Sequence, residues 1–204
     1  GKSSLAVLLA AFSGLEKLTF ADTDPQQSTK LAFEAMFGQV ATGNSQLVID
    51  SFADLEKVVR RSAGQNKQTI LVDTSAGLSP HEVAEARVAS LLLVPVSSSS
   101  VELNAARKFI SSLQEINYPV PILIVPNKIN DNSDLLKIIT VFRALPCMLA
   151  SPVPYDRRIE KLLADQHFPG ELANLREAAF PLIRSINNAI KSPYLPDSKL
   201  RQID

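Results

Sequence analysis

Short apolar runs alternate with longer amphipathic stretches along most of this chain. The runs of strand length predict strands at Leu18–Ala21, Thr69–Val72, Leu91–Val96, Val120–Val125 and Cys147–Ala150. All but the last are continuously apolar, as is typical of parallel strands buried on both faces. Helical periodicity predicts helices at Ser4–Phe12, Gln27–Phe37, Phe52–Ser62, Pro80–Ala89, Val101–Gln114, Asp134–Ala144, Arg157–Asp165 and Leu172–Ile190. The pattern therefore predicts an α/β fold, a doubly wound and mostly parallel sheet with helices on both faces.

Two of the predicted helices have clear start signals. The stretches Ser79-Pro80-His81-Glu82 and Ser99-Ser100-Val101-Glu102 both match a capping box, and the first places proline at the first helical position. In the second helix an apolar residue recurs at every fourth position, which predicts one stripe packed against the sheet. The stripe consists of Val101, Ala105, Phe109 and Leu113.

The composition suits a globular domain. With 204 residues, 46% of them hydrophobic and 21% charged, the chain can bury one substantial core. We predict one domain over residues 1–192. Pro193 and Pro196 then introduce a polar segment, which predicts a frayed tail over residues 193–204.

Charge and cysteine content narrow the possible functions. The chain has 21 basic and 21 acidic residues, so binding to nucleic acid or to an anionic bilayer would need a local patch. Cys147 is the one cysteine, which excludes an internal disulfide framework and a multi-cysteine metal site within one chain. The apolar runs are too short to cross a bilayer, and the N-terminus lacks the pattern of an export signal. We expect a cytoplasmic protein.

The first residues, Gly1-Lys2-Ser3-Ser4, match the end of a phosphate-binding loop. In such a loop a lysine reaches the β and γ phosphates, and the next hydroxyl ligates Mg²⁺. This assigns Lys2 to the phosphates and Ser3 to the metal, with Ser4 close to the α phosphate. We expect the first strand of the sheet and the start of the loop to precede Gly1. The four residues alone are weak evidence, because this short motif recurs by chance.

Acidic residues follow two of the predicted strands. Asp22 and Asp24 stand one residue apart at a strand end, and strand alternation sends such side chains to the same side. Asp73 ends the run "TILVD" in the form of a Walker B strand, whose carboxylate holds Mg²⁺ through water. A solvated turn is the alternative for the first pair, and a helix cap is the alternative for Asp73.

An asparagine follows a further strand, in "ILIVPNKIN". The amide of Asn127 both donates and accepts hydrogen bonds, so it can read the edge of a purine base. Asparagine in an ordinary turn is the alternative. These motifs occur in the order phosphate loop, two carboxylate segments and base loop, each at a strand end, and ligands bind at that edge of a parallel sheet.

Taken together, the motifs resemble the ParA/MinD family of P-loop ATPases, whose deviant Walker A loop has the form KGGxGK[ST]. The resemblance runs through "GKSS", "ADTDPQQS", "LVDTSAGLS", "LLLVPVSSSSVELNAARKFI", "IVPNK" and "PVPYDRRIEKLL", and so spans nearly the whole chain. The Asp-x-Asp-Pro-Gln element favours the ParA branch, which includes partition ATPases and carboxysome-positioning, McdA-like proteins. The family loop's first lysine, which acts across the dimer, would lie upstream of Gly1.

The resemblance implies roles for the site residues and names the cofactors, ATP and Mg²⁺. Lys2 and Asp24 would be catalytic, with Asp24 positioning the attacking water. Asp22 and Asp73 would join Ser3 in organising Mg²⁺. Gly1, Lys2, Ser3 and Ser4 would hold the phosphates. Asn127, Pro154 and Asp156 would surround the adenine.

The resemblance also implies how such a protein works. It forms a homodimer with two ATP molecules sandwiched between the subunits, binds nucleoid DNA non-specifically, and is released when a cargo-bound adaptor stimulates slow hydrolysis. The candidate DNA contacts are Arg157, Arg158, Arg184 and Lys191, for which a solvated helix face is the alternative. The Leu172–Ile190 helix is expected to pack on the core rather than on a membrane, because prolines and a polar tail follow it.

Two other classes of function remain open. One is a P-loop metabolic synthetase or an iron–sulfur reductase, although Cys147 alone cannot supply the two cysteines per subunit that a bridging cluster needs. The other is a pseudo-ATPase that serves as an interaction scaffold. Equal ATP turnover in the protein and in its Asp24→Ala variant would favour the scaffold.

Overall fold

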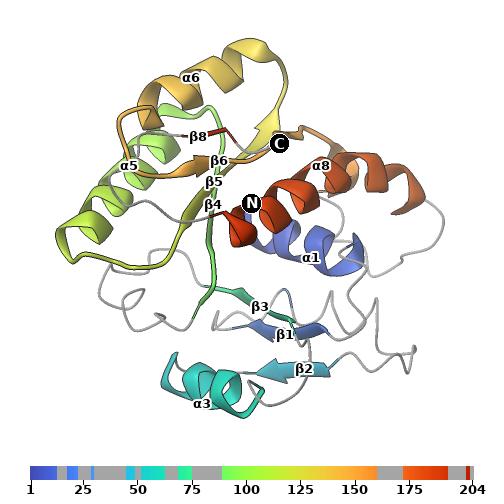
Figure 1. Cartoon of the computed structure of the whole chain (residues 1–204). Coiled ribbons are helices and arrows are strands. Elements are labelled where there is room, and N and C mark those ends of the chain that lie inside the picture. The colour runs from blue at the N-terminus through green and yellow to red at the C-terminus, as the bar shows by residue number, and fades with distance from the viewer. Residues whose placement is uncertain are drawn as a thin grey trace. The chain divides into compact units, whose positions relative to one another are not determined.

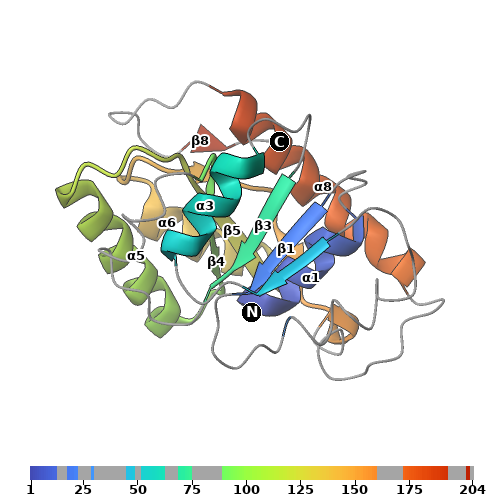
Figure 2. The ribbon, with the colours of Figure 1, turned by 90° about the horizontal axis from the view of Figure 1, so that it is seen from below.

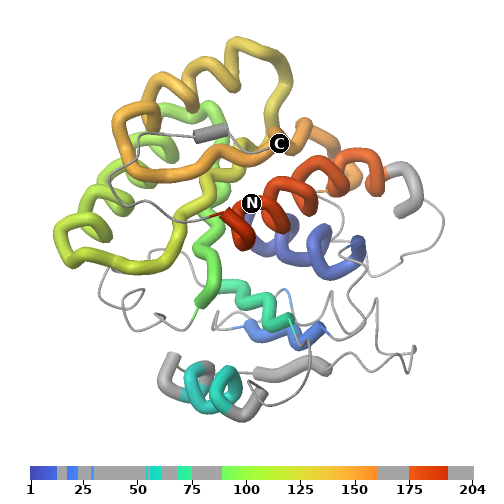
Figure 3. The backbone as a smooth tube through the Cα atoms, viewed as in Figure 1, coloured from blue at the N-terminus to red at the C-terminus, as the bar shows by residue number. Residues whose placement is uncertain are grey.

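The protein is described here from a computed structural model, which places residues 1–12, 18–22, 29, 45–48, 52–62, 69–74, 89–159, 172–192 and 201–202. Figure 3 traces the backbone from the N-terminus to the C-terminus. The chain divides into two compact units. One comprises Gly1–Val88 with Arg157–Arg176, and the other comprises Ala89–Asp156 with Glu177–Asp204. The expected domain end at residue 192 stays a prediction.

The first unit contains a parallel sheet with the strand order β2-β1-β3, seen side by side in Figure 2. Strand β1 spans Leu18–Asp22, β2 spans Ser45–Val48 and β3 spans Thr69–Asp73. β1 and β3 coincide with predicted apolar runs and extend them by one aspartate each. β2 was not predicted, because its four residues, Ser-Gln-Leu-Val, form no continuous apolar run.

Helices α1, Lys2–Phe12, and α3, Phe52–Ser62, pack on this sheet. The even residues of β1, Leu18 and Phe20, form a buried cluster with Ala6 and Ala10 of α1. Ala21, which points the other way along the strand, instead contacts valines of α3. The two helices therefore cover opposite faces. Residues 4–10 of α1 are all buried, which agrees with a helix that is apolar on every side.

The second unit contains a sheet with the order β4-β5-β6-β8, in which every pairing is parallel, and β7 also pairs with β5. Its strands are β4, Leu92–Val96; β5, Ile122–Ile129; β6, Met148–Leu149; β7, Val153–Pro154; and β8, Arg201–Gln202. The parallel sheets with flanking helices confirm the predicted fold class. β8 lies in the segment for which the sequence predicts a frayed tail, so two residues of that segment are ordered by pairing with β6.

The part of the chain beyond Ala89 that the structure describes includes the helices α5, Ser100–Glu115; α6, Asn132–Phe142; and α8, Leu172–Lys191 (Figure 1). Helix α6 begins earlier than predicted because Asp131 caps it, accepting hydrogen bonds from the amides of Ser133 at 2.7 Å and Asp134 at 3.1 Å. The predicted helices Gln27–Phe37, Pro80–Ala89 and Arg157–Asp165 lie mostly outside the described residues. Within them, Thr29 and residues 157–159 are helical and Ala89 is not.

The predicted apolar stripe on α5 was right at Leu113, which is fully buried, and wrong at its other end. Val101 is 79% exposed, whereas the buried residues of this helix are Leu103, Ile110 and Leu113. A step of four residues advances about 40° beyond a full turn, so a line drawn every fourth residue drifts around the helix. Leu103, Ile110 and Leu113 are seven and three residues apart, and these spacings keep side chains on one face of the helix.

The predicted capping box at Ser99 was right for the start of α5 but wrong for its hydrogen bonds. Ser99 is the N-cap residue, yet its side chain makes no capping bond. Glu102 instead accepts hydrogen bonds from the amide and the hydroxyl of Ser97, at 3.1 and 2.8 Å. These bonds lower the pKa of the Glu102 carboxyl. The other predicted box, at Ser79, lies outside the described residues.

Candidate functional site

Two buried carboxylates stand side by side at the ends of β1 and β3. Asp22 pairs with Asp73 in the parallel register, and they are 2% and 3% exposed. Paired residues of neighbouring strands point to the same face of a sheet. Asp22 lies two residues beyond Phe20, so both carboxylates belong to the face that α1 covers.

Helix α1 begins beside this pair with the residues of the predicted phosphate loop. The Gly1 carbonyl accepts a hydrogen bond from the Leu5 amide at 3.2 Å, which fixes the first turn. The hydroxyl of Ser3 is hydrogen-bonded to Asp73, and the Lys2 ammonium lies near enough to act on the charge of Asp73. The first turn of α1 contains no acidic residue, so its amide dipoles and Lys2 together favour an anion.

Thr29 also contacts this site, and the sequence analysis missed it. Its side chain is fully buried, and its Oγ1 donates a hydrogen bond of 2.5 Å to Oδ2 of Asp73. No periodic pattern marks a single threonine of this kind. Its one visible signal is its place shortly after the Asp-x-Asp-Pro-Gln stretch, in a helix that follows a strand end.

The two neighbouring carboxylates are not fully compensated by positive charge. Burial raises the pKa of the Asp73 carboxyl, and the neighbouring Asp22 raises it further. Hydrogen bonds from Thr29 and Ser3, and the charge of Lys2, act in the opposite direction but do not outweigh burial. A cation bound here would relieve both the desolvation and the repulsion between the carboxylates.

The available donors suit Mg²⁺ better than a metal held by protein ligands alone. Among the described residues there is no cluster of three or more His, Cys, Asp or Glu side chains that could hold a metal. Mg²⁺ is commonly bound through one or two carboxylates together with phosphate oxygens and water. Asp22, Asp73 and the Ser3 hydroxyl fit that pattern.

The structure thus brings Lys2, Ser3, Asp22 and Asp73 to one end of the sheet in the first unit. Ser4 is buried in the first turn of α1 beside them. Asp24, the expected water-positioning residue, lies outside the described residues, and its placement stays a prediction.

The predicted base-reading residues gather in the second unit. Asn127 is 8% exposed near the end of β5, and it pairs with Val153 of β7, the neighbour of Pro154. Its Oδ1 accepts a hydrogen bond of 3.0 Å from the Lys128 amide, which orients the side-chain amide group. Pro154 is exposed and Asp156 follows at the end of the same loop.

Strand β5 has an irregular register just after Asn127, and Lys128 there has a φ of 60°. This left-handed conformation disfavours any side chain and most of all a β-branched one. We therefore expect Lys128→Val to unfold more readily than Lys128→Gly by about 1–2 kcal/mol. Urea denaturation of the two variants measures the difference. Equal midpoints would show that the backbone at residue 128 does not need this conformation.

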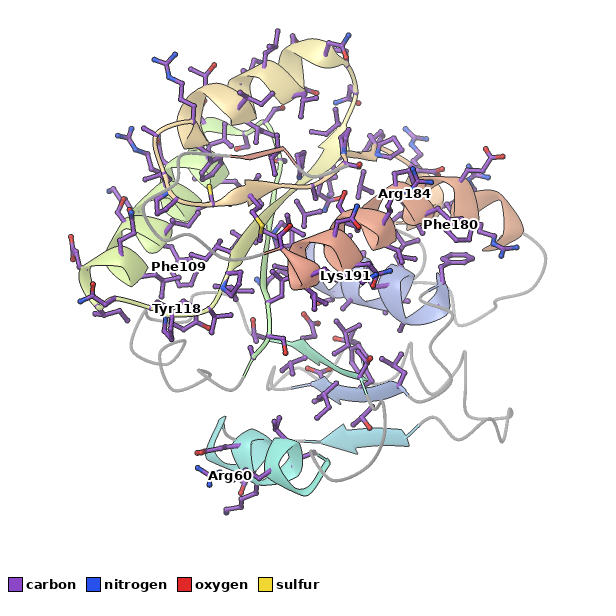
Figure 4. The ribbon with its side chains drawn as sticks, viewed as in Figure 1. Arg60, Phe109, Tyr118, Phe180, Arg184 and Lys191 are labelled. Carbon is purple, nitrogen blue, oxygen red and sulfur yellow. The ribbon has the colours of Figure 1, made fainter. Side chains whose placement is uncertain are left out.

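The candidate DNA contacts lie at two places. Arg184 and Lys191 are both exposed on α8, and their spacing puts them on the same side of the helix as Phe180 (Figure 4). None of the ion pairs among the described residues involves either side chain. Arg157 is exposed and Arg158 half-buried in the short helical stretch 157–159, which belongs to the first unit.

The protein resembles known proteins in its structure, whereas comparison of its sequence found no match. The sequence matches no protein-family profile and no curated protein. A chain of the MinC:MinD cell division protein complex from Aquifex aeolicus superposes with a TM-score of 0.71 at 12% identity, covering 98% of this chain and 95% of that one. The cell division ATPase MinD of Pyrococcus furiosus gives a TM-score of 0.61 at 15% identity, with 92% and 93% covered. MinD from Aquifex aeolicus gives 0.59 at 14% identity, with 91% of each chain covered. The fold is that of the MinD ATPases.

This likeness confirms the predicted P-loop fold and leaves the ParA branch as a prediction. The three alignments cover more than nine-tenths of both chains in each pair. No helix in the described part of the chain is both long and apolar enough to traverse a bilayer.

Proposed function

We propose that this protein is a ParA/MinD-type ATPase that binds Mg²⁺–ATP and hydrolyses it slowly. The observation that carries the proposal is the meeting of Lys2, Ser3, Asp22 and Asp73 at one sheet edge. A lysine at a helix N-terminus would hold phosphate, and the hydroxyl and buried carboxylates would hold Mg²⁺, which supplies positive charge for phosphoryl transfer. The likeness of the fold to MinD, a cell division ATPase in Pyrococcus furiosus, supports the same reaction.

Each residue then has a role in hydrolysis. Lys2 and the first amides of α1 neutralise the β and γ phosphates. Ser3, hydrogen-bonded to Asp73, would hold Mg²⁺ together with Asp22 and Asp73. Asp24 positions the attacking water, and Asn127, Pro154 and Asp156 contact adenine.

We further infer the ParA branch of the family, on the strength of the Asp-x-Asp-Pro-Gln element. In this reading ATP drives formation of a homodimer that binds nucleoid DNA without sequence preference. A cargo-bound adaptor then stimulates hydrolysis and releases the dimer. The cargo would be a plasmid, a chromosome or a carboxysome.

Retention of random-sequence duplex DNA on a native gel tests the DNA-binding part of the proposal. The full-length protein should retain DNA with Mg²⁺–ATP and not with ADP, and salt should weaken the retention. ATP turnover measured in the same preparation tests the enzymatic part separately. Turnover without ATP-dependent retention would leave the ATPase and remove the DNA-binding role.

Replacing both Arg184 and Lys191 with alanine is expected to weaken DNA retention at every sequence tested. Loss of two phosphate contacts would lower the slope of log affinity against log salt by about 2. ATP turnover without DNA should stay unchanged, because neither side chain belongs to the nucleotide site. Arg60→Ala is the matched control, since this exposed arginine of α3 lies in the first unit and is ion-paired with Glu56 at 2.6 Å. Equal losses in both proteins would show that α8 is not the DNA surface.

A further inference from the structure

We propose that Ser185 of α8 is a positioning residue for nucleotide selectivity, because it fixes the loop Ser151–Asp156 that carries the adenine-side residues. This inference rests on the proposed function. The sequence motifs do not include Ser185, which lies in the middle of a helix expected only to pack on the core.

The hydroxyl of Ser185 is fully buried and makes contacts on two sides. Its Oγ accepts a hydrogen bond of 3.0 Å from the Ser151 amide. It lies 3.1 Å from the Pro181 carbonyl and 3.2 Å from Ser151 Oγ, and it can donate its single proton to either. Ser185 therefore joins α8 to the first residue of the loop.

The rest of the loop is held by β5, on its other side. The Ala150 amide donates to the Ile124 carbonyl and the Tyr155 amide donates to the Ile129 carbonyl, both at 2.9 Å. Between these two anchors, Pro152 and Pro154 have no amide proton to give. The Ser151 amide, next to the Ala150 amide that faces β5, points the other way and donates to Ser185 Oγ.

This contact bears on the base site because of what the loop carries. Val153 pairs with Asn127, so a shift of the loop changes the spacing between Asn127 and Pro154. Removal of the Ser185 hydroxyl leaves the Ser151 amide to find water or to move, and either outcome loosens this spacing. Lys2 and Ser3, the residues proposed to contact the phosphates, belong to the first unit and take no part in this hydrogen bond.

The helix itself should tolerate the loss of this hydroxyl. A serine that bonds back to the carbonyl four residues earlier contributes little to a helix, and alanine is the best helix former. An effect of Ser185→Ala on base selectivity would therefore not follow from a weaker α8.

The test compares ATP and GTP dissociation constants for the full-length protein and its variants, with the midpoint of urea unfolding as a second readout. In Ser185→Ala the preference for ATP over GTP should fall by about fivefold, the value of one ordinary hydrogen bond. Amide exchange at Ser151 should become faster. Ser185→Thr, which restores a hydroxyl, should recover the preference. Ala189→Gly is the matched control, because it weakens α8 one turn from Ser185 by removing a buried methyl group that forms no hydrogen bond.

The outcomes separate this inference from the proposed function. Wild-type selectivity and unchanged Ser151 exchange in Ser185→Ala would overturn the inference while leaving the ATPase in place. Equal losses in Ser185→Ala and Ala189→Gly would overturn it as well. If the alanine variant does not fold, Ser185→Cys gives the same test, because it keeps the side-chain volume and supplies only a weak acceptor. A wild-type protein that binds no ATP would contradict the proposed function itself.

Discussion

Replacing Lys2 with alanine is expected to lower ATP turnover by about 100-fold or more, because in the proposed site the lysine would supply positive charge where the transferred phosphoryl group gains negative charge. ATP affinity should fall as well, since a charged hydrogen bond to the phosphates is lost. The nucleotide-free protein should keep its fold. Lys2 stands at the first position of α1 and is only half-buried, so its side chain is not part of the core. Initial rates at saturating Mg²⁺–ATP, with circular dichroism as the check on folding, measure the effect.

Lys57→Ala is the matched control for this variant. Lys57 is an exposed lysine of the same unit, paired with Asp54 at 2.8 Å on the surface of α3. An exposed pair of this kind contributes little to stability, so turnover should stay within about twofold of wild type. A Lys2→Ala protein that hydrolyses ATP as fast as Lys57→Ala would show that the first residues of the chain are not a phosphate loop.

The sequence predicted the parts of the fold that follow from apolar runs and helical period. The strands β1, β3, β4 and β5 lie on continuous apolar runs, and α3 has the predicted bounds. The strands that were missed, β2, β7 and β8, are two to four residues long, and β2 and β8 also contain polar residues. Such strands exist because a neighbouring strand offers unpaired backbone groups, and that is a tertiary cause with no local pattern.

Some residues of the candidate site could be predicted from the sequence, and others could not. Asp22 and Asp73 could be paired from the sequence, because each ends an apolar strand and parallel strands end at a common edge. Thr29 and Ser185 could not be found in this way. Each is a small hydroxyl residue that is marked by one hydrogen bond to a partner distant in sequence, Asp73 for the first and Ser151 for the second. Periodicity describes which face is buried and does not describe which hydrogen bond is made there.

Replacing Asp73 with asparagine is expected to change stability in opposite directions with and without the nucleotide. Because burial and Asp22 raise the pKa of this carboxyl in the folded state, the folded protein is penalised once pH exceeds the ordinary carboxyl pKa of 3.8. At pH 7 the nucleotide-free Asp73→Asn protein should therefore be more stable than wild type, and the difference should shrink as pH falls toward 3.8. Asparagine can still accept the hydrogen bond from Thr29.

With Mg²⁺–ATP bound, the wild type should be more stable than Asp73→Asn. A ligand at a concentration 100 times its dissociation constant stabilises the folded state by about 2.7 kcal/mol, and only the wild type retains the Asp73 carboxylate that we propose holds the metal. Thermal unfolding with and without Mg²⁺–ATP measures both effects. Asp54→Asn, at the exposed carboxylate paired with Lys57, should leave the shift caused by the nucleotide unchanged.

If Asp73→Asn kept the full Mg²⁺–ATP shift, the paired carboxylates would not be a magnesium site, and the geometry at the end of β1 and β3 would need another function. If it lowered the stability of the nucleotide-free protein instead, the two carboxylates would already be balanced by the charge of Lys2 and the hydrogen bonds from Ser3 and Thr29.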